Sequence, residues 1–171
     1  MRVSRKGLLR GLVKGLVRTV VRGVALLAFA ACAAVVIKLT LTPSQASVGI
    51  AHTNLHPGAT IRLYLDRPSV REALLQVGGN IVVGVPFGLL LPVVSRRLRG
   101  PVRVTLLTAA SITVLEGLQH YFVVGRSFDV DDIILAAAGG LVGYLLMGRR
   151  LSRRIHPAGQ PGRAAVRMHT V

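Results

Sequence analysis

Four long blocks of apolar residues dominate the chain and are separated by polar or basic segments. They lie at about residues 24–41, 74–94, 102–124 and 133–147. An α-helix needs ~20 apolar residues to cross the hydrocarbon core of a bilayer, and the first three blocks have about that length. A helix also pairs its backbone N–H and C=O groups internally, as a lipid environment requires. The pattern therefore predicts an all-α integral membrane bundle of four transmembrane helices within residues 24–147.

Residues 1–23, which precede the first block, carry a basic residue and a glycine at about every fourth position. On a helix this spacing collects the lysines and arginines on one face and leucines and valines on the other. Such a basic amphipathic N-terminal helix is typical of segments that lie on an anionic cytoplasmic leaflet. A cleaved signal peptide is the alternative, but the basic region is long and Phe29 fits a cleavage site poorly.

Composition and charge point to a membrane as the partner. The chain has 51% hydrophobic residues and a formal net charge of +16. Its bases cluster beside the apolar blocks and no nucleic-acid-binding module is recognisable, so we expect an anionic lipid surface and not nucleic acid. All but five of the 22 lysines and arginines fall in residues 1–23, the 95–103 segment and the 148–171 tail. The positive-inside rule then predicts a multi-pass cell-membrane protein with both termini in the cytoplasm, the C-terminal tail being disordered.

The strongly polar side chains of the blocks fall toward the predicted outer side. Glu116 lies in the third block, ten residues before Arg126, which corresponds to roughly 15 Å along a helix. Gln119 and His120 follow Glu116 by three and four residues and can share its helical face. An outward-facing polar pocket is therefore predicted from seven residues: Asn80, Glu116, Gln119, His120, Arg126, Asp129 and Asp132.

Two interpretations of Glu116 stay open. A carboxyl group inside a membrane can accept a proton, bind a cation or anchor a polar ligand. It can equally form a structural clamp that locks helices together by pairing with Asn80, Gln119 or His120. Asp129 and the acids after it can likewise cap the fourth helix or hold a divalent cation. Because no ligand loop is defined around them, the sequence predicts no metal and no cofactor.

Catalytic motifs are not recognisable in the chain. Neither Ser111 nor Ser127 has a histidine base at an interpretable spacing, and no glycine-rich phosphate-binding loop is visible. The single cysteine, Cys32, lies in an alanine-rich apolar run and excludes an intrachain disulfide. An enzyme is therefore not favoured, although the sequence leaves the question open.

Short motifs occur in a fixed order over roughly residues 54–147. They are Asn54-Leu55-x-Pro57, Gly79-Asn80, Val85-Pro86-Phe87-Gly88, Ser111 with Glu116-x-x-Gln119, Gly125-Arg126-Ser127-Phe128-Asp129-Val130-Asp131-Asp132, and Gly139-Gly140-x-x-Gly143-Tyr144. Together they resemble the VanZ-like membrane protein family. The resemblance places the family's polar positions on Asn80, Glu116, Gln119, Arg126, Asp129 and Asp132. This chain departs from the family at Ala136, where an asparagine is usual, and at Val85, where a phenylalanine is usual.

The resemblance implies a small bacterial multi-span protein of the cell envelope, in a family whose namesake is associated with low-level resistance to the glycopeptide teicoplanin. We therefore expect a protein that binds a polar or amphiphilic ligand, such as a cell-wall lipid or a glycopeptide, or a partner, in an outward-facing pocket. The alternatives are a membrane enzyme acting on a lipid-linked cell-wall intermediate and a structural subunit of a membrane complex. The oligomeric state is left open.

Overall fold

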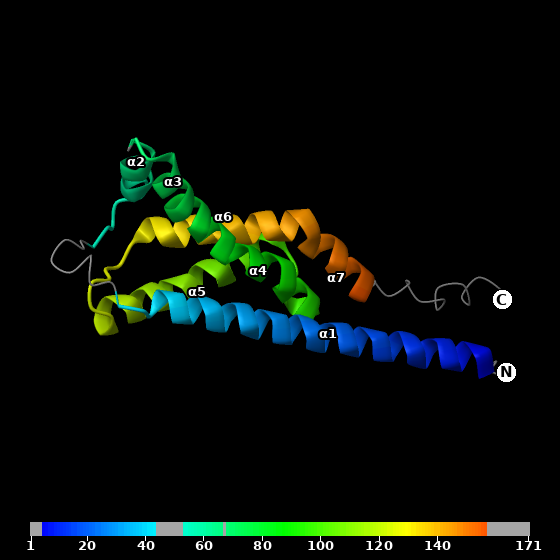
Figure 1. Cartoon of the computed structure of the whole chain (residues 1–171). Coiled ribbons are helices and arrows are strands. Elements are labelled where there is room, and N and C mark those ends of the chain that lie inside the picture. Colours follow the sequence, from blue (N-terminus) through cyan, green and yellow to red (C-terminus); the bar gives the residue numbers. More distant parts are fainter. Residues whose placement is uncertain (1–4, 44–52, 67, 157–171) are drawn as a thin grey trace, which may run out of the picture.

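The computed structural model describes residues 5–43, 53–66 and 68–156, which form a bundle of helices (Figure 1). In chain order the α-helices of this part are α1 (Arg5–Thr40), α2 (Ala59–Leu65), α3 (Val70–Ala73), α4 (Gly79–Val94), α5 (Pro101–Phe122), α6 (Val130–Gly143) and α7 (Arg149–Ile155). The π-helical turns Leu74–Gly78 and Tyr144–Gly148 join α3 to α4 and α6 to α7 without a break. A short 3-10 turn, Arg96–Leu98, leads from α4 toward α5.

The described residues contain four helical stretches long and apolar enough to cross a membrane, as predicted. They are Gly11–Thr40, Val70–Val94, Pro101–Phe122 and Val130–Ile155. Large apolar side chains cover their outer surfaces: Leu27 is 72% exposed and Phe122 is 79% exposed. Water would oppose so much exposed apolar surface, whereas lipid solvates it. The fourth stretch runs to Ile155 and not to residue 147, because the second π-helical turn carries the helix past Gly148.

Helix α1 combines the basic N-terminal segment and the first span in one uninterrupted helix. The sequence predicted that residues 1–23 lie along the membrane surface, but in the structure the described part of this segment continues in line with the span (Figure 1). No proline occurs between Arg5 and Thr40, and each glycine lowers helix propensity by only about 1 kcal/mol. No residue near position 23 is therefore able to end the helix there.

Helices α4 and α6 form the centre of the bundle, where their backbones touch through glycine. A Cβ atom added to Gly84 would lie 1.8 Å from the carbonyl oxygen of Ala136, and one added to Gly139 would lie 1.9 Å from that of Ile81. Gly88 and Gly143 show the same kind of close approach. Small residues at such crossings allow the backbone contact on which helix association in lipid depends.

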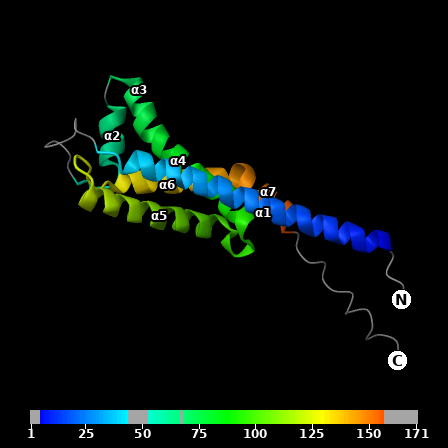
Figure 2. The same cartoon turned by 60° about the horizontal axis from the view of Figure 1, so that its bottom comes forward.

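The other long helices pack on this pair. Helix α5 lies against α6, where a Cβ atom on Gly140 would lie 2.6 Å from the hydroxyl oxygen of the buried Thr108. Helix α1 packs against α4 (Figure 2), and the rings of Phe29 and Phe87 meet edge to face with centroids 5.1 Å apart. Such an aromatic pair contributes about 0.5–1.5 kcal/mol beyond the apolar area that it buries. The phenylalanine pair thus fixes α1 against the central helices.

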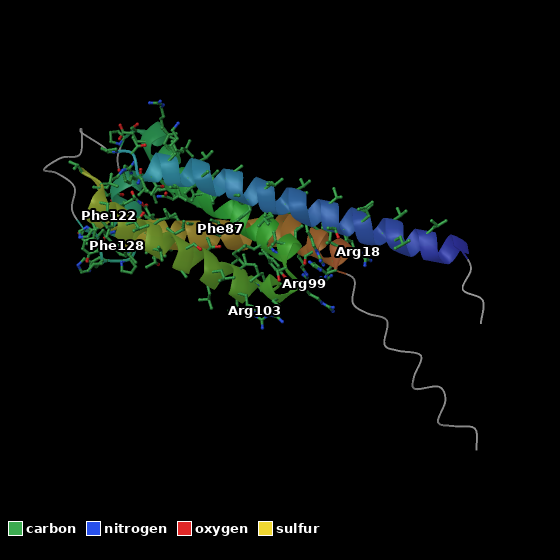
Figure 3. All side chains as sticks on the ribbon, turned by 90° about the horizontal axis from the view of Figure 1, so that it is seen from below. Arg18, Phe87, Arg99, Arg103, Phe122 and Phe128 are labelled. Carbon is green, nitrogen blue, oxygen red and sulfur yellow. The ribbon has the colours of Figure 1, made fainter. Side chains whose placement is uncertain are left out.

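His156 joins three elements through contacts with Arg22, Val93 and Arg99. Figure 3 shows Arg99 at this end of the bundle. An Nη atom of Arg22 lies 2.7 Å from His156 Nδ1, so Nδ1 accepts and Nε2 carries the proton that it donates to the carbonyl of Val93 at 3.1 Å. Arg99 donates to the carbonyl of His156 at 3.2 Å. Burial, together with Arg22, Arg99 and Arg96, lowers the pKa of the imidazole below its usual value. His156 therefore works as a neutral bridge between α1, the end of α4 and the loop after it.

We predict that Gly84→Ala destabilises the protein by about 1–3 kcal/mol, because the new methyl group must displace the backbone of α6. Thermal unfolding in detergent measures the effect. The matched control is Gly117→Ala in α5, where an added Cβ meets nothing within 4 Å. That control is expected to be neutral or slightly stabilising, because alanine is the better helix former. Equal unfolding temperatures for the two variants would contradict the central role of the α4 and α6 contact.

Candidate functional site

The segment before α2 and the loop that enters α6 pair through their backbones at one end of the bundle. Asn54 N–H donates to the carbonyl of Phe128 at 2.8 Å, and Val130 N–H donates to the carbonyl of Asn54 at 3.0 Å. These bonds make an isolated parallel bridge between Asn54 and Asp129. Two regions that are about 75 residues apart in the sequence are thereby held in register.

Asp131 is fully buried and holds the first turn of α2. Its carboxylate accepts the backbone N–H groups of Gly58 at 2.6 Å, Thr60 at 2.8 Å and Ile61 at 3.2 Å. These groups lie at the start of α2, where a helix leaves its N–H donors without partners inside the helix. Gly58 turns its N–H toward the carboxylate with a φ of 87°, a conformation that glycine adopts at little cost. Asp131 is thus a cap supplied to α2 by another helix.

Asp129 links the start of α6 to the segment before α2 and to α2 itself. It is the N-cap of α6, where its side chain accepts the N–H of Asp131 at 2.8 Å. The carboxylate also accepts the side-chain amide of Asn54 at 2.9 Å and the hydroxyl of Thr60 at 2.7 Å. Of the two interpretations that the sequence left open for this residue, the helix cap is the one present in the geometry.

Glu116 is buried in α5 and faces the same loop. One carboxylate oxygen accepts the side-chain amide of Gln119 at 2.9 Å, and the other accepts the backbone N–H of Asp129 at 3.2 Å. The spacing of three residues places Glu116 and Gln119 on one helical face, as predicted. Their hydrogen bonds have the form of the clamp interpretation, since they link α5 to the start of α6.

Asn80 and Asp132 make the corresponding link between α4 and α6. The side-chain amide of Asn80 donates to the carboxylate of Asp132. The bond lies on the same pair of helices as the glycine contact, and Asn80 faces the protein as predicted. A hydrogen bond between membrane helices contributes roughly 0.6–2 kcal/mol, so this pair adds modestly to the association of α4 with α6.

The two remaining predicted residues lie on the surface of this cluster. His120 is exposed, and its ring packs edge-on against Tyr121 with centroids 5.1 Å apart. Arg126 is also exposed and donates to the carbonyl of Leu39 near the end of α1 at 3.3 Å. The hydrogen bonds that the Glu116 carboxylate accepts come instead from Gln119 and Asp129.

A polar pocket of about 480 Å³ lies beside the cluster. It is here called the outer pocket, after the orientation that the sequence predicts. Its lining comprises Thr53, Asn54, Ala59, Thr60, Leu63, Tyr64, Gln76 and Asp129. Asp129 is the member of the predicted set that lines it, whereas the wall comes from α2, the segment before it and the π-helical turn before α4. Amide, hydroxyl and carboxylate groups beside Leu63 can hydrogen-bond a polar ligand that also carries an apolar part.

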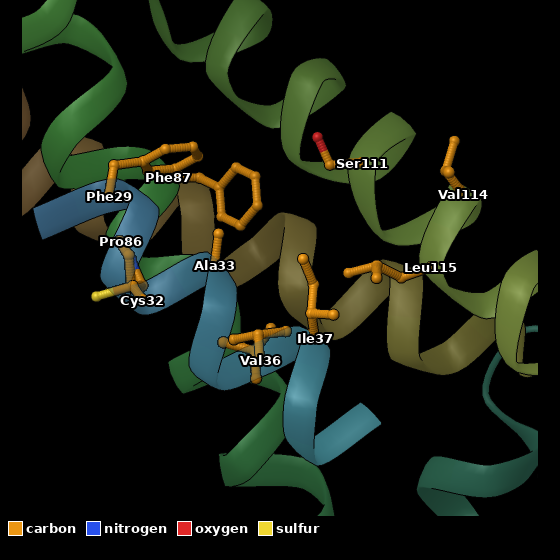
Figure 4. A pocket seen from close by; sticks show the side chains of 11 residues that line it. Phe29, Cys32, Ala33, Val36, Ile37, Pro86, Phe87, Ser111, Val114 and Leu115 are labelled. Atoms are coloured by element: carbon orange, nitrogen blue, oxygen red, sulfur yellow. The ribbon is translucent and has the colours of Figure 1, made fainter. Parts of the chain in front are cut away.

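A second pocket of about 390 Å³ is almost entirely apolar and lies between α1, α4 and α5 (Figure 4). Phe29 and Phe87 border it at one side, with Val36 and Leu115 farther along. Ser111 also lines it, but its hydroxyl donates to the carbonyl of Leu107 at 2.8 Å. Such a surface inside a membrane can accept an acyl chain by apolar contact.

Metal ligation was the other interpretation of Asp129, Asp131 and Asp132, here called the acidic turn. Within the ranges that the structure describes, no group of three or more histidine, cysteine, aspartate or glutamate side chains is arranged to hold a metal ion. Asp129 and Asp131 instead accept hydrogen bonds from N–H and O–H groups of the protein. The histidines His52 and His56 are four residues apart in the sequence, but His52 lies outside the described residues.

Sequence reasoning missed three residues of the cluster: Asn54, Thr60 and Asp131. Asn54 is part of the motif that carries the family resemblance, which was a signal for it, and Asp131 lies inside the acidic turn. Thr60 gave no signal of its own. Its role depends on α2 lying against the start of α6, which no local pattern encodes.

We predict that Asp131→Asn detaches α2, because an amide nitrogen replaces an oxygen that accepts backbone N–H groups. The free energy of opening α2 should fall by roughly 3 kcal/mol, which accelerates amide exchange there on the order of 100-fold. Hydrogen exchange of peptides covering residues 58–65 measures this. The control Asp66→Asn removes the same charge from the exposed end of α2 and should leave exchange nearly unchanged. Similar rates in the two variants would refute the capping role.

Comparison with known protein families agrees with the motifs of the sequence. The family model described as VanZ/LLP1 matches residues 25–151, which cover the four candidate spans except for residues 11–24 of the first and 152–155 of the last. The searches among curated proteins and solved structures found no match. Because the family model covers well over half of the chain, this helical membrane protein belongs to the VanZ/LLP1 family.

Proposed function

We propose that this protein resides in the cell envelope and holds the polar part of an amphiphilic ligand in the outer pocket. The observation that carries the proposal is the pocket itself, a space of about 480 Å³ with amide, hydroxyl and carboxylate groups in its wall. Asn54, Thr60 and Asp129 are fixed in that wall by their mutual hydrogen bonds. A wall that is already ordered binds a ligand without the entropy cost of ordering it.

The lining indicates the chemistry of the ligand. Gln76 supplies an amide, Thr53 and Tyr64 supply hydroxyl groups, and Leu63 supplies an apolar surface. These groups suit sugars and peptide amides, which donate and accept hydrogen bonds without a strong charge. Glycopeptides and lipid-linked cell-wall intermediates both contain such groups. The proposal therefore includes a role in glycopeptide resistance of the kind associated with the family namesake.

The buried carboxylates of Glu116 and Asp131 hold in place the residues that line this pocket. Glu116 accepts the N–H of Asp129, and Asp131 caps the helix that contributes Leu63 and Tyr64. In this proposal the clamp keeps the pocket in shape and the residues of α2 meet the ligand. Substitutions in the clamp then lower protein stability, whereas substitution of Leu63, an apolar lining residue outside this hydrogen-bond network, lowers binding alone.

The proposal places the outer pocket outside the cell and both termini in the cytoplasm, because most lysines and arginines lie at the opposite end of the spans. We predict that Leu55→Cys, in a Cys32→Ser background, reacts with a membrane-impermeant maleimide in intact cells. Arg153→Cys should react only after permeabilisation. Both positions are exposed in the structure, so reactivity reports the side of the membrane. If only Arg153→Cys is labelled in intact cells, the orientation is the opposite of the one proposed.

We predict that Leu63→Trp, which fills the outer pocket, weakens binding of purified protein to teicoplanin or to a lipid-linked cell-wall precursor by about tenfold, or ~1.4 kcal/mol. Cells producing the variant should lose any protection against teicoplanin while keeping a normal level of the protein. The matched control is Leu55→Trp, which changes an exposed leucine that does not line this pocket. If Leu63→Trp binds both compounds as tightly as the control, the outer pocket is not the ligand site.

A further inference from the structure

A pocket of about 530 Å³ at the opposite end of the bundle gathers arginine side chains from separate elements, and is here called the basic pocket. Arg18 and Arg22 come from α1, Arg96 and Arg97 come from the 3-10 turn after α4, and His156 closes the set after α7. Figure 3 shows Arg18 and Arg99 at this end, on the side where α1 passes the ends of α4 and α7. The four guanidinium groups belong to segments that are over 70 residues apart in the sequence.

The chain offers these arginines no carboxylate side chain. All six acidic residues lie between Asp66 and Asp132, and those placed in the site above are at the far end of the spans. Like charges brought together raise the free energy of the folded protein unless counter-charge binds among them. The convergence of arginines is therefore unfavourable by itself and favourable with an anion in the pocket.

Arg22 is held in place by a neutral group. His156 Nδ1 accepts from Arg22, while His156 Nε2 donates to the carbonyl of Val93. A guanidinium group carries five N–H donors, so this bond leaves donors of Arg22 for a ligand. Arg103 donates to the carbonyl of Arg97 at 2.9 Å, which fixes the turn that presents Arg96 and Arg97. The donors of the basic pocket are thus positioned before a ligand arrives.

The wall of the basic pocket also has an apolar side. Val94 is the last residue of the second candidate span and Ile155 is the last residue of the fourth, and both line the pocket. The pocket therefore lies where the second and fourth spans end, at the level of lipid head groups. Arginine is the side chain best suited to bind phosphate by paired N–H donors.

We propose that the basic pocket binds a phosphate-bearing anion, and that in the membrane this is the phosphate of an anionic lipid head group. The site is independent of the outer pocket, since it lies at the other end of the helices and shares no lining residue with it. An anionic lipid held there joins α1 to the ends of α4 and α7.

The experiment measures binding of phosphatidylglycerol and phosphatidylcholine to the full-length detergent-purified chain by native mass spectrometry. Wild type should retain phosphatidylglycerol preferentially, and Arg96→Gln together with Arg97→Gln should reduce this retention about tenfold. The matched control is Arg153→Gln together with Arg154→Gln, which removes two exposed charges of α7 that do not line the pocket. It should change retention less than about twofold. Equal loss in the two double variants would show general surface attraction and overturn the site.

Two further arms identify the anion and exclude a folding defect. Inorganic phosphate at millimolar concentration should displace phosphatidylglycerol only weakly; if it binds alone and phosphatidylglycerol does not, the lipid assignment is wrong. Arg96→Lys together with Arg97→Lys keeps the charge and should retain a substantial part of the lipid binding. The unfolding temperature of each variant without lipid is expected to be no lower than that of wild type, because the glutamine variant loses mutually repelling charges and the lysine variant keeps them. Retained lipid preference in a stable Arg96→Gln, Arg97→Gln variant would refute the proposal.

Discussion

The backbone contact between α4 and α6 is the constraint on which the rest of the molecule depends. Lipid is as apolar as leucine, so membrane helices gain little from burying apolar side chains against each other. Gly84 and Gly139 instead bring carbonyl groups of the facing helix within van der Waals distance. Asn80 and Asp132 add a hydrogen bond along the same crossing. Helices α1 and α5 then pack on a pair whose register is already set.

That register decides what the acidic cluster can do. Because α6 is fixed against α4, its first turn is held beside the segment that leads into α2, and Asp131 reaches the backbone N–H groups there. A buried carboxylate is costly unless donors surround it. The cluster meets that requirement with amide and hydroxyl donors, and Glu116 extends the network into α5. The carboxylates thus build a rigid wall on which the outer pocket depends.

The two ends of the bundle have opposite chemistry. Carboxylates gather at the end that carries α2, whereas arginines gather at the end that carries His156. The carboxylates at the acidic end accept hydrogen bonds from N–H donors of the protein. The arginines at the basic end have no acidic side chain of this protein beside them. This difference supports the two proposals, an uncharged, hydrogen-bonding ligand in the outer pocket and an anion in the basic pocket.

The sequence by itself determined the helical membrane architecture, because helix length and the apolar requirement of lipid are local properties of a segment. The pairing of Glu116 with Gln119 and the capping by Asp129 were among the alternatives that spacing within one helix or turn allowed, and the structure selected them. The tertiary structure alone decided that Asp131 caps α2 and that Arg22 meets His156, 134 residues away. Such contacts depend on the register between helices, which side-chain shape at their crossings sets and residue periodicity does not encode.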